Sequence, residues 1–138
     1  MYIQPAADLI KKHEGLRLKP YHCSAGKLTI GYGRNLEDNG ISLSEAEQML
    51  YDDIQNCYAD CVHLACWNNL NEARQAVLLD MCYNLGFAGL KKFKKMLEAL
   101  EVSAYHRAAL EMLDSQWARQ VKGRATELAQ IMEKGELK

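Results

Sequence analysis

Residues 13–34 read HEGLRLKPYHCSAGKLTIGYGR, a segment whose hydrophobic residues occupy every second position in two places. These residues are Leu16 and Leu18, and then Leu28, Ile30 and Tyr32. Alternation with a period of two is typical of a strand, and the intervening Ser24–Lys27, which includes a glycine, is typical of a turn. The segment therefore predicts a small antiparallel sheet with Cys23 and Thr29 on the strands that flank the turn. Such a sheet needs helices packed against it to be stable.

The segment before the predicted sheet has helical periodicity. Its hydrophobic residues fall at Ile3, Ala6, Ala7 and Ile10. The pattern stops at Gly15, the residue type favoured just beyond the end of a helix. Glu14 is therefore expected at the C-terminus of an N-terminal helix.

The segment after the predicted sheet reads as one long helix. Ser44-x-x-Glu47 matches the capping-box pattern, and helical periodicity continues from about Leu43 to Cys66. Further helical patterns cover about residues 70–85, 90–100, 108–113 and 125–132. We expect Ser103 to cap the third of these helices, and glycines to stop or separate others.

The order of these elements predicts the α+β class. We expect one domain over residues 1–138, with a small β lobe at about 14–42. The larger helical lobe would cover about 66–138 and include the N-terminal helix. A long helix would join the two lobes, with a cleft between them.

The composition excludes several classes of protein. Of the 138 residues, 49% are hydrophobic and 25% are charged, with a net charge of −1. These values argue against disorder and against a basic surface for nucleic acid. No hydrophobic run approaches the about 20 residues of a membrane span, so we expect no membrane insertion. No heptad or exposed hydrophobic repeat indicates an oligomer, and we expect a monomer.

The charge is uneven along the chain. Four lysines cluster at Lys91, Lys92, Lys94 and Lys95. A solvated helix face is one interpretation of this cluster, and attraction to an anionic polymer is the other.

The sequence has five cysteines, an odd number, so at least one thiol is free, which suits synthesis in a reducing cytosol. Cys57, Cys61 and Cys66 lie near His63, a combination that can bind a metal. The C-x-x-C spacing of structural zinc sites is absent, however, and Cys57 and Cys61 fall on a hydrophobic helix face. We therefore expect no metal and no cofactor.

One set of motifs resembles a known family. Glu14-Gly15, Cys23 and Thr29-Ile30-Gly31-Tyr32-Gly33 are similar to the signature E-G-x8-[D/C]-x5-T-x-G-x-G of the phage-type lysozymes. The resemblance continues, in order, in Tyr83-Asn84-Leu85-Gly86, Ser115-Gln116-Trp117 and Gly123-Arg124-Ala125. It covers essentially the whole chain and implies a lysozyme-like fold.

The resemblance also implies a reaction, the hydrolysis of β-1,4 bonds between N-acetylmuramic acid and N-acetylglucosamine in peptidoglycan. By analogy, Glu14 is the general acid that protonates the leaving oxygen. Cys23 is a water-orienting base or stabiliser, and Thr29 positions the water or the substrate. No cofactor is implied.

Three further positions match substrate-binding residues of the family. Tyr83 and Asn84 match cleft positions that line saccharide subsites. Arg124 matches a basic residue that in relatives lies close to the catalytic glutamate.

Cys23 is a departure from the better-known members, which have aspartate there, and implies the branch of the family with cysteine. A free thiol has a pKa of about 8.5 and is mostly protonated at neutral pH unless its surroundings stabilise the thiolate. Its role could be a base that orients water, an electrostatic stabiliser or a nucleophile. We favour the first, and a tolerated bystander is the remaining alternative.

Arg34 is a second departure, because relatives often have histidine after the second glycine. An arginine can form the same structural ion pair. The two glycines, Gly31 and Gly33, are expected to allow close backbone approach or a positive φ.

Other functions remain open from the sequence. A lytic transglycosylase also uses one glutamate and forms an anhydro product. A cysteine peptidase or amidase would need a histidine base, for which His13, His22, His63 and His106 are the candidates. A peptidoglycan-binding module without catalysis is the fourth possibility.

An endolysin implies bacterial host cell lysis. No N-terminal export signal is visible, so we expect synthesis in the host cytoplasm and action on the cell wall after release. A separate pore-forming protein would provide that release.

Overall fold

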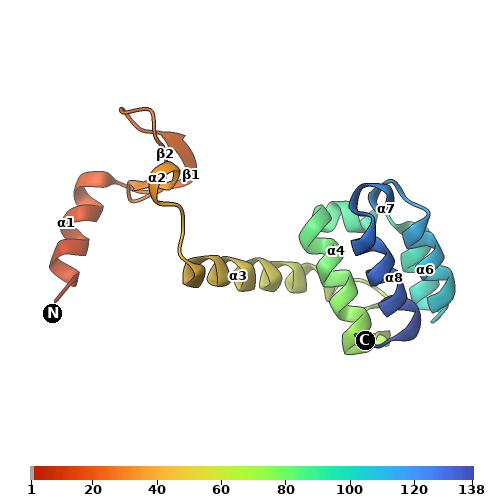
Figure 1. The fold of residues 1–138 in the computed structure, drawn as a ribbon. Helices are drawn as coiled ribbons and strands as arrows, with labels where there is room; N and C mark the ends of the chain where they lie inside the picture. Colours follow the sequence, from red (N-terminus) through yellow and green to blue (C-terminus); the bar gives the residue numbers. More distant parts are fainter. Residues whose placement is uncertain (1) are drawn as a thin grey trace. The chain divides into compact units, whose positions relative to one another are not determined.

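The computed structural model describes residues 2–138, which form eight α-helices, one short 3-10 helix and a three-stranded antiparallel sheet. This content confirms the predicted α+β class. The chain divides into two compact units, one that ends at Gln48 and one that begins at Met49 (Figure 1). The assignment of the N-terminal helix to the helical lobe stays a prediction.

The first unit begins with helix α1 (Gln4–Glu14). Pro5 lies in its first turn, where the missing N–H costs nothing. The helix ends as predicted at Gly15, whose φ is +73° and whose N–H donates to the Lys11 carbonyl over 3.1 Å. None of its residues is buried within this unit.

The sheet of the first unit has the strand order β1-β2-β3. Its strands are β1 (Arg17–His22), β2 (Leu28–Gly31) and β3 (Arg34–Asn35). Thr29 pairs with Tyr21 on one side and with Asn35 on the other, and is therefore central in the sheet. The predicted hairpin is confirmed.

A short helix, α2 (Leu36–Asn39), follows the sheet, and a loop then leads into α3 (Leu43–Cys61). The predicted capping box is displaced by two residues. The Glu45 N–H donates to Ser42 Oγ over 3.1 Å, and the Ser42 N–H donates to Glu45 Oε1 over 2.9 Å. The pair Ser42 and Glu45 therefore caps α3, and the prediction of Ser44 and Glu47 is wrong.

Helix α3 is five residues shorter than predicted. After Cys61 the chain continues in tight turns, in which the His63 and Leu64 N–H groups donate to carbonyls three residues earlier. A 3-10 helix at Trp67–Asn69 follows. These turns redirect the chain, and Cys66 and Trp67 are buried in the core.

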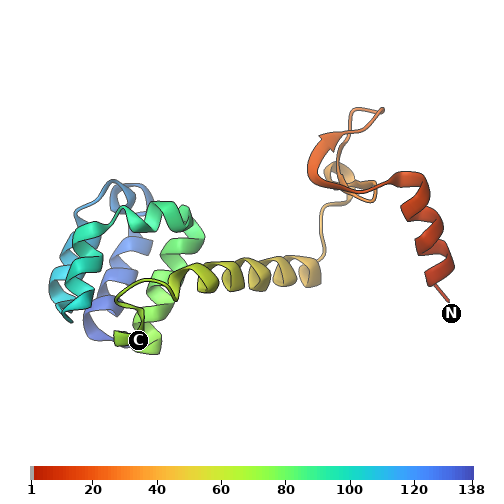
Figure 2. The ribbon, with the colours of Figure 1, turned by 180° about the vertical axis from the view of Figure 1, so that it is seen from behind.

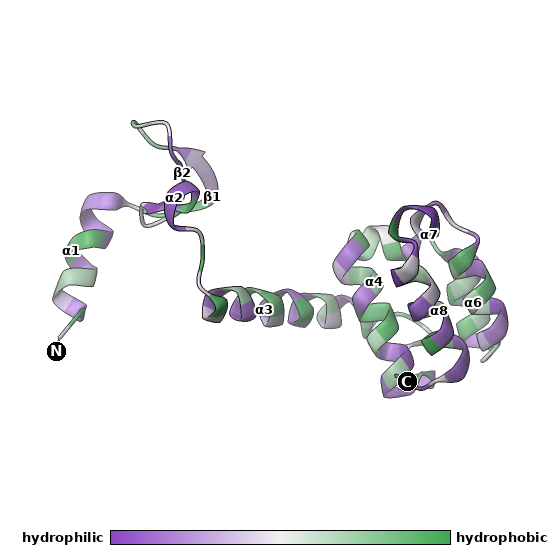
Figure 3. Cartoon of the chain, viewed as in Figure 1, coloured by the Kyte–Doolittle hydropathy of each residue, from purple (hydrophilic) through white to green (hydrophobic). Residues whose placement is uncertain are grey.

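The second unit is built from helices around one hydrophobic core (Figure 2). They are α4 (Glu72–Lys91), α5 (Lys94–Glu101), α6 (Tyr105–Leu113), α7 (Gln116–Val121) and α8 (Gly123–Lys134). Hydrophobic and hydrophilic segments alternate along α4, α6 and α8, as expected of helices that bury one face (Figure 3). Each helix within residues 2–138 is too short or too polar to cross a membrane.

Glycine and serine interrupt the helices of this unit, not always as predicted. Gly86 has a φ of +77° and breaks α4, as expected. Ser115 caps α7 by accepting a hydrogen bond from the Ala118 N–H over 3.0 Å. The predicted cap at Ser103 is wrong, because Ser103 occupies a turn with a φ of +59° and Ala104 precedes α6 without a side-chain cap.

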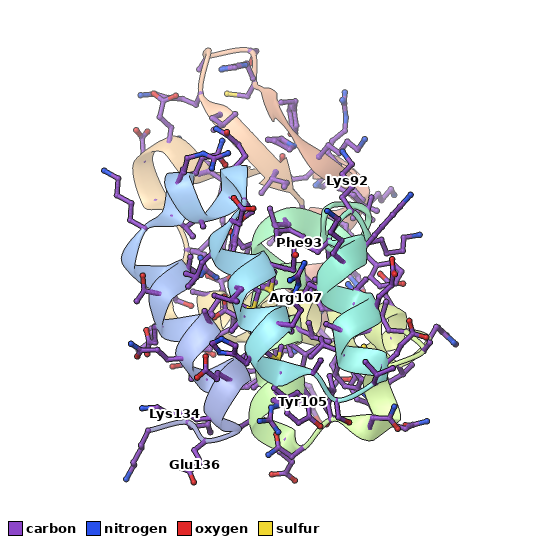
Figure 4. All side chains as sticks on the ribbon, turned by 90° about the vertical axis from the view of Figure 1, so that its right-hand side faces the viewer. Lys92, Phe93, Tyr105, Arg107, Lys134 and Glu136 are labelled. Atoms are coloured by element: carbon purple, nitrogen blue, oxygen red, sulfur yellow. The ribbon has the colours of Figure 1, made fainter. Side chains whose placement is uncertain are left out.

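The C-terminal end of α8 is held by Arg74 of α4. Its guanidinium donates to the carbonyls of Met132 and Glu133 over 2.7 and 2.8 Å. It also stacks on the Tyr105 ring, 3.4 Å from the ring centroid. Figure 4 shows Tyr105 near the end of the chain, where Lys134 and Glu136 are labelled.

Candidate active site

Glu14 is the last residue of α1, as predicted, and its side chain is exposed within the first unit. The carboxyl group lies against Gly33, in the turn between β2 and β3. A Cβ atom added to Gly33 would meet Glu14 Oε2 and would lie 2.9 Å from Cδ. The glycine-containing motif therefore borders the candidate general acid.

Cys23 is the residue immediately after β1. Its N–H donates to the Lys27 carbonyl over 2.9 Å, and its carbonyl accepts from the Gly26 N–H over 2.8 Å. The prediction that Cys23 lies on a strand is wrong by one residue, because strand pairing ends at His22 and Leu28. Cys23 opens the turn, and the turn fixes its backbone.

The turn also determines the ionisation of Cys23. Hydrogen bonds from the backbone of Lys27, and then of Ala25, hold the pKa of the thiol below its ordinary value. Partial burial works in the opposite direction but is the smaller effect. Backbone N–H groups that point at a sulfur favour the thiolate. This environment suits a base or an electrostatic stabiliser better than a packing residue.

Thr29 is central in β2 and only 3% exposed. Its hydroxyl donates to the Lys27 carbonyl over 2.8 Å. The same hydroxyl also contributes to the lowered pKa of Cys23, but its single proton is engaged with this carbonyl. The turn amides therefore carry most of the effect. Cys23, through its N–H, and Thr29, through its hydroxyl, therefore both donate hydrogen bonds to the Lys27 carbonyl.

Three ion pairs support this region. Lys27 Nζ lies 3.2 Å from Asp38 and 3.6 Å from Glu37 of α2. Arg34, the second departure from the family pattern, forms the expected structural ion pair, with Nη1 2.6 Å from Glu45 Oε1. These contacts tie the sheet to α2 and to the beginning of α3.

Tyr83 and Arg124 border one cavity of about 380 Å³ in the second unit. Its other lining residues are Leu50, Ile54, Ala76, Leu79 and Asp80. Arg124 Nε donates to Asp80 Oδ1 over 2.8 Å, and the two side chains form an ion pair in which Nη2 lies 2.7 Å from the same oxygen. Sequence reasoning missed Asp80, although it lies three residues before Tyr83 and so on the same helix face.

Asn84 makes a different contact from its neighbour Tyr83. Its Oδ1 accepts a hydrogen bond from Trp117 Nε1 over 2.8 Å. Trp117 is 4% exposed and packs edge-to-face on Phe93. Asn84 therefore connects α4 to α7, and its predicted role in substrate binding stays a prediction.

A second cavity of the same unit, of about 670 Å³, was not visible in the sequence. Three members of the lysine cluster, Lys92, Lys94 and Lys95, border it together with Trp117. Figure 4 labels Lys92 and Phe93 at the start of α5. Glu111 and Asp114 also line this cavity, so its charge is mixed.

The remaining cysteines pack in or against the core of the second unit, as the helix face of Cys57 and Cys61 predicted for those two. Cys61, Cys66 and Cys82 are buried, and burial raises the pKa of Cys57 to about 12 and of Cys61 to about 11. All five cysteines are free thiols. Within residues 2–138, no group of three or more possible metal ligands comes together.

Comparison with known proteins decides the family. The model of the phage lysozyme family matches residues 11–133, which include every candidate residue described above. The chain belongs to the phage lysozyme family. The resemblance seen in the motifs is thereby confirmed, and membership makes the chain a hydrolase of the lysozyme type.

Individual relatives agree with this family. Probable T4-type lysozyme 2 of Dictyostelium discoideum is 27% identical over 161 residues and covers 95% of each chain. An endolysin of Acyrthosiphon pisum secondary endosymbiont phage 1 is 30% identical over 131 residues, which are 91% of this chain and 86% of the endolysin. The pre-baseplate central spike protein of Enterobacteria phage T4 is 28% identical over 160 residues, and the chain spans only 28% of its length.

Proposed function

We propose that the chain is an endolysin that hydrolyses the β-1,4 bonds between N-acetylmuramic acid and N-acetylglucosamine in peptidoglycan. Family membership and the endolysins among the relatives support this proposal. The observation that carries it is the pairing of an exposed carboxyl group with a thiol whose pKa is lowered, both in the first unit. Hydrolysis would lyse the bacterial host.

The mechanism assigns one proton transfer to each of two residues. Glu14, in its protonated form, gives its proton to the glycosidic oxygen as the bond to the anomeric carbon breaks. A water molecule attacks that carbon and passes a proton to the Cys23 thiolate. Thr29 holds the turn that carries Cys23, and its hydroxyl oxygen can accept a hydrogen bond from the water or the sugar. Return of a proton from Cys23 to Glu14 through solvent restores the starting state.

The second unit would bind the saccharide. Tyr83 offers an aromatic face beside a cavity, an arrangement suited to packing on a sugar ring. Arg124 is oriented by its hydrogen bond and ion pair with Asp80, which leaves the third guanidinium nitrogen, Nη1, for a sugar oxygen. Asn84 would contribute the N–H donors of its amide.

The experiment is the release of reducing ends from purified peptidoglycan by the wild type and by variants. Glu14→Gln should abolish nearly all turnover without loss of folding. Glu47→Gln, which changes another exposed glutamate of the first unit, is the matched control and should retain activity. Full turnover by a folded Glu14→Gln variant would contradict the assignment of Glu14. Binding to peptidoglycan that Glu14→Gln leaves unchanged, with no new reducing ends from the wild type, would indicate a binding module.

Substitution of Cys23 tests the second proton transfer. Cys23→Asp should keep activity, because a carboxylate can accept the water's proton, whereas Cys23→Ser should lose most of it. A Cys23→Ser variant with wild-type activity would make Cys23 a bystander. The mass of the products decides the remaining alternative, since an anhydro product lighter by one water would indicate a lytic transglycosylase.

A further inference from the structure

Gly33 differs from the other glycines of the first unit, because only at Gly33 would an added Cβ atom meet another residue within 4 Å. A Cβ atom at Gly33 would meet Glu14 Oε2, would lie 2.9 Å from Cδ and would lie 3.3 Å from Cγ. Real Cβ atoms are almost never that close to another heavy atom. Any side chain at position 33 would therefore displace the Glu14 carboxyl group.

Gly31 provides the comparison. It lies two residues earlier in the same motif and has a φ of +71°, close to the +78° of Gly33. A Cβ atom at Gly31 would nevertheless meet nothing within 4 Å. Both glycines therefore have a positive φ, which disfavours a side chain, but only at Gly33 would a side chain also clash with a neighbouring residue.

Within the first unit, the Glu14 carboxylate takes part in no hydrogen bond or ion pair, and its side chain is exposed. In this unit Glu14 extends from the end of α1, and its carboxyl group lies against Gly33. Restraint by contact alone leaves both oxygens available to a substrate, whereas a hydrogen bond to the protein would occupy one of them.

We propose that Gly33 is the positioning residue for the general acid, because its lack of a side chain leaves the space that the Glu14 carboxyl group occupies. The inference rests on the proposed function of Glu14. A proton donor must approach the leaving oxygen within hydrogen-bond distance, and a displacement of about 1 Å can cost roughly 10²-fold in rate. Gly33 acts through Glu14 and does not touch the reacting atoms.

The test compares Gly33→Ala with Gly31→Ala, because the two glycines have similar positive φ values. Gly33→Ala should lower kcat by roughly 10²-fold and leave KM nearly unchanged, because the saccharide still binds. Gly31→Ala should change kcat far less. Equal losses of kcat in the two variants, or wild-type kcat in Gly33→Ala, would overturn the proposal.

A second measurement separates this proposal from that for Glu14. Thermal unfolding is compared for each glycine substitution with Glu14 present and in a Glu14→Ala background. Gly33→Ala should lower the melting temperature more when Glu14 is present, and Gly31→Ala should lower it equally in both backgrounds. This coupling is expected even if Glu14 is not the general acid, so the two proposals can fail separately.

Loss of folding is also informative. If Gly33→Ala alone does not fold but folds in the Glu14→Ala background, the steric contact is established. If neither folds while Gly31→Ala does, position 33 is needed for a reason other than Glu14, and the proposal is wrong.

Discussion

The sulfur of Cys23 differs from the other four in its surroundings. Backbone hydrogen bonds from Lys27 and Ala25 lower the pKa of its thiol. Burial instead raises the pKa of Cys57 to about 12. Two thiols of one chain are therefore tuned in opposite directions, one by a turn and the other by a helical core.

This difference predicts selective alkylation. At about pH 7, iodoacetamide should modify Cys23 at least about tenfold faster than Cys57, because the thiolate is the reactive form. Peptide mass mapping at successive times measures the order of labelling. In the unfolded protein the two sites should react at similar rates. Equal rates in the folded protein would contradict the effect of the turn.

Residue-scale chemistry was only partly predictable. Glu14, Cys23 and Thr29 were proposed as site residues from a motif, and the residues that fix their backbone are close to them in sequence. Their roles stay predictions. Asp80 was missed because its partner, Arg124, lies 44 positions further along the chain. Local patterns contain no information about such a pairing.

At the scale of elements, the beginning of α3 shows how a distant contact selects between equivalent local patterns. Ser42-x-x-Glu45 and Ser44-x-x-Glu47 both fit the capping box. Arg34, from β3, binds Glu45 and so favours the first. The sheet and the helices were predictable from periodicity, but their boundaries depend on such contacts.

The same contact predicts a pH dependence. Hydrogen bonds from Arg34 and then Ser42 lower the pKa of Glu45 from 4.5 to about 2. A carboxyl group whose pKa is lower in the folded state stabilises it above the unfolded value, and this stabilisation disappears as the pH falls through the folded value. Stability should therefore fall between about pH 4.5 and pH 2.

Glu45→Gln should be less stable than the wild type at neutral pH and should show a weaker dependence on pH in this window. Urea unfolding followed by circular dichroism across the window measures both effects. Glu47→Gln is the control, with an unchanged slope. An identical pH dependence in Glu45→Gln and the wild type would contradict the role of this ion pair.

At the scale of the molecule, the hydrophobic core described by the structure lies in the second unit. Side chains of this core, such as Leu78, Met81 and Met112, have no exposed surface. In the first unit, α1 buries none of its residues, and Thr29 is buried in the sheet. The sequence did not reveal this imbalance, because α1 has a hydrophobic periodicity similar to that of the buried helices. That the protein is a monomer stays a prediction.

The core of the second unit predicts strong protection of its backbone. Amides of α4 should exchange with deuterium only on global unfolding, and those of α1 should share this protection if α1 belongs to the helical lobe, as the sequence predicts. Hydrogen exchange of the full chain, read by mass spectrometry, measures both helices in one experiment. Equal protection of α1 and α4 would show that α1 is stabilised by more than its own unit.

The Lys27 carbonyl, which accepts hydrogen bonds from the Cys23 N–H and the Thr29 hydroxyl, has a consequence for evolution. Both bonds fix the turn without using the side chain of residue 23. The backbone therefore specifies where that side chain lies but not which chemical group it presents. We therefore expect that a substitution of cysteine by aspartate at this position would change the chemistry of the site and leave the turn around it the same.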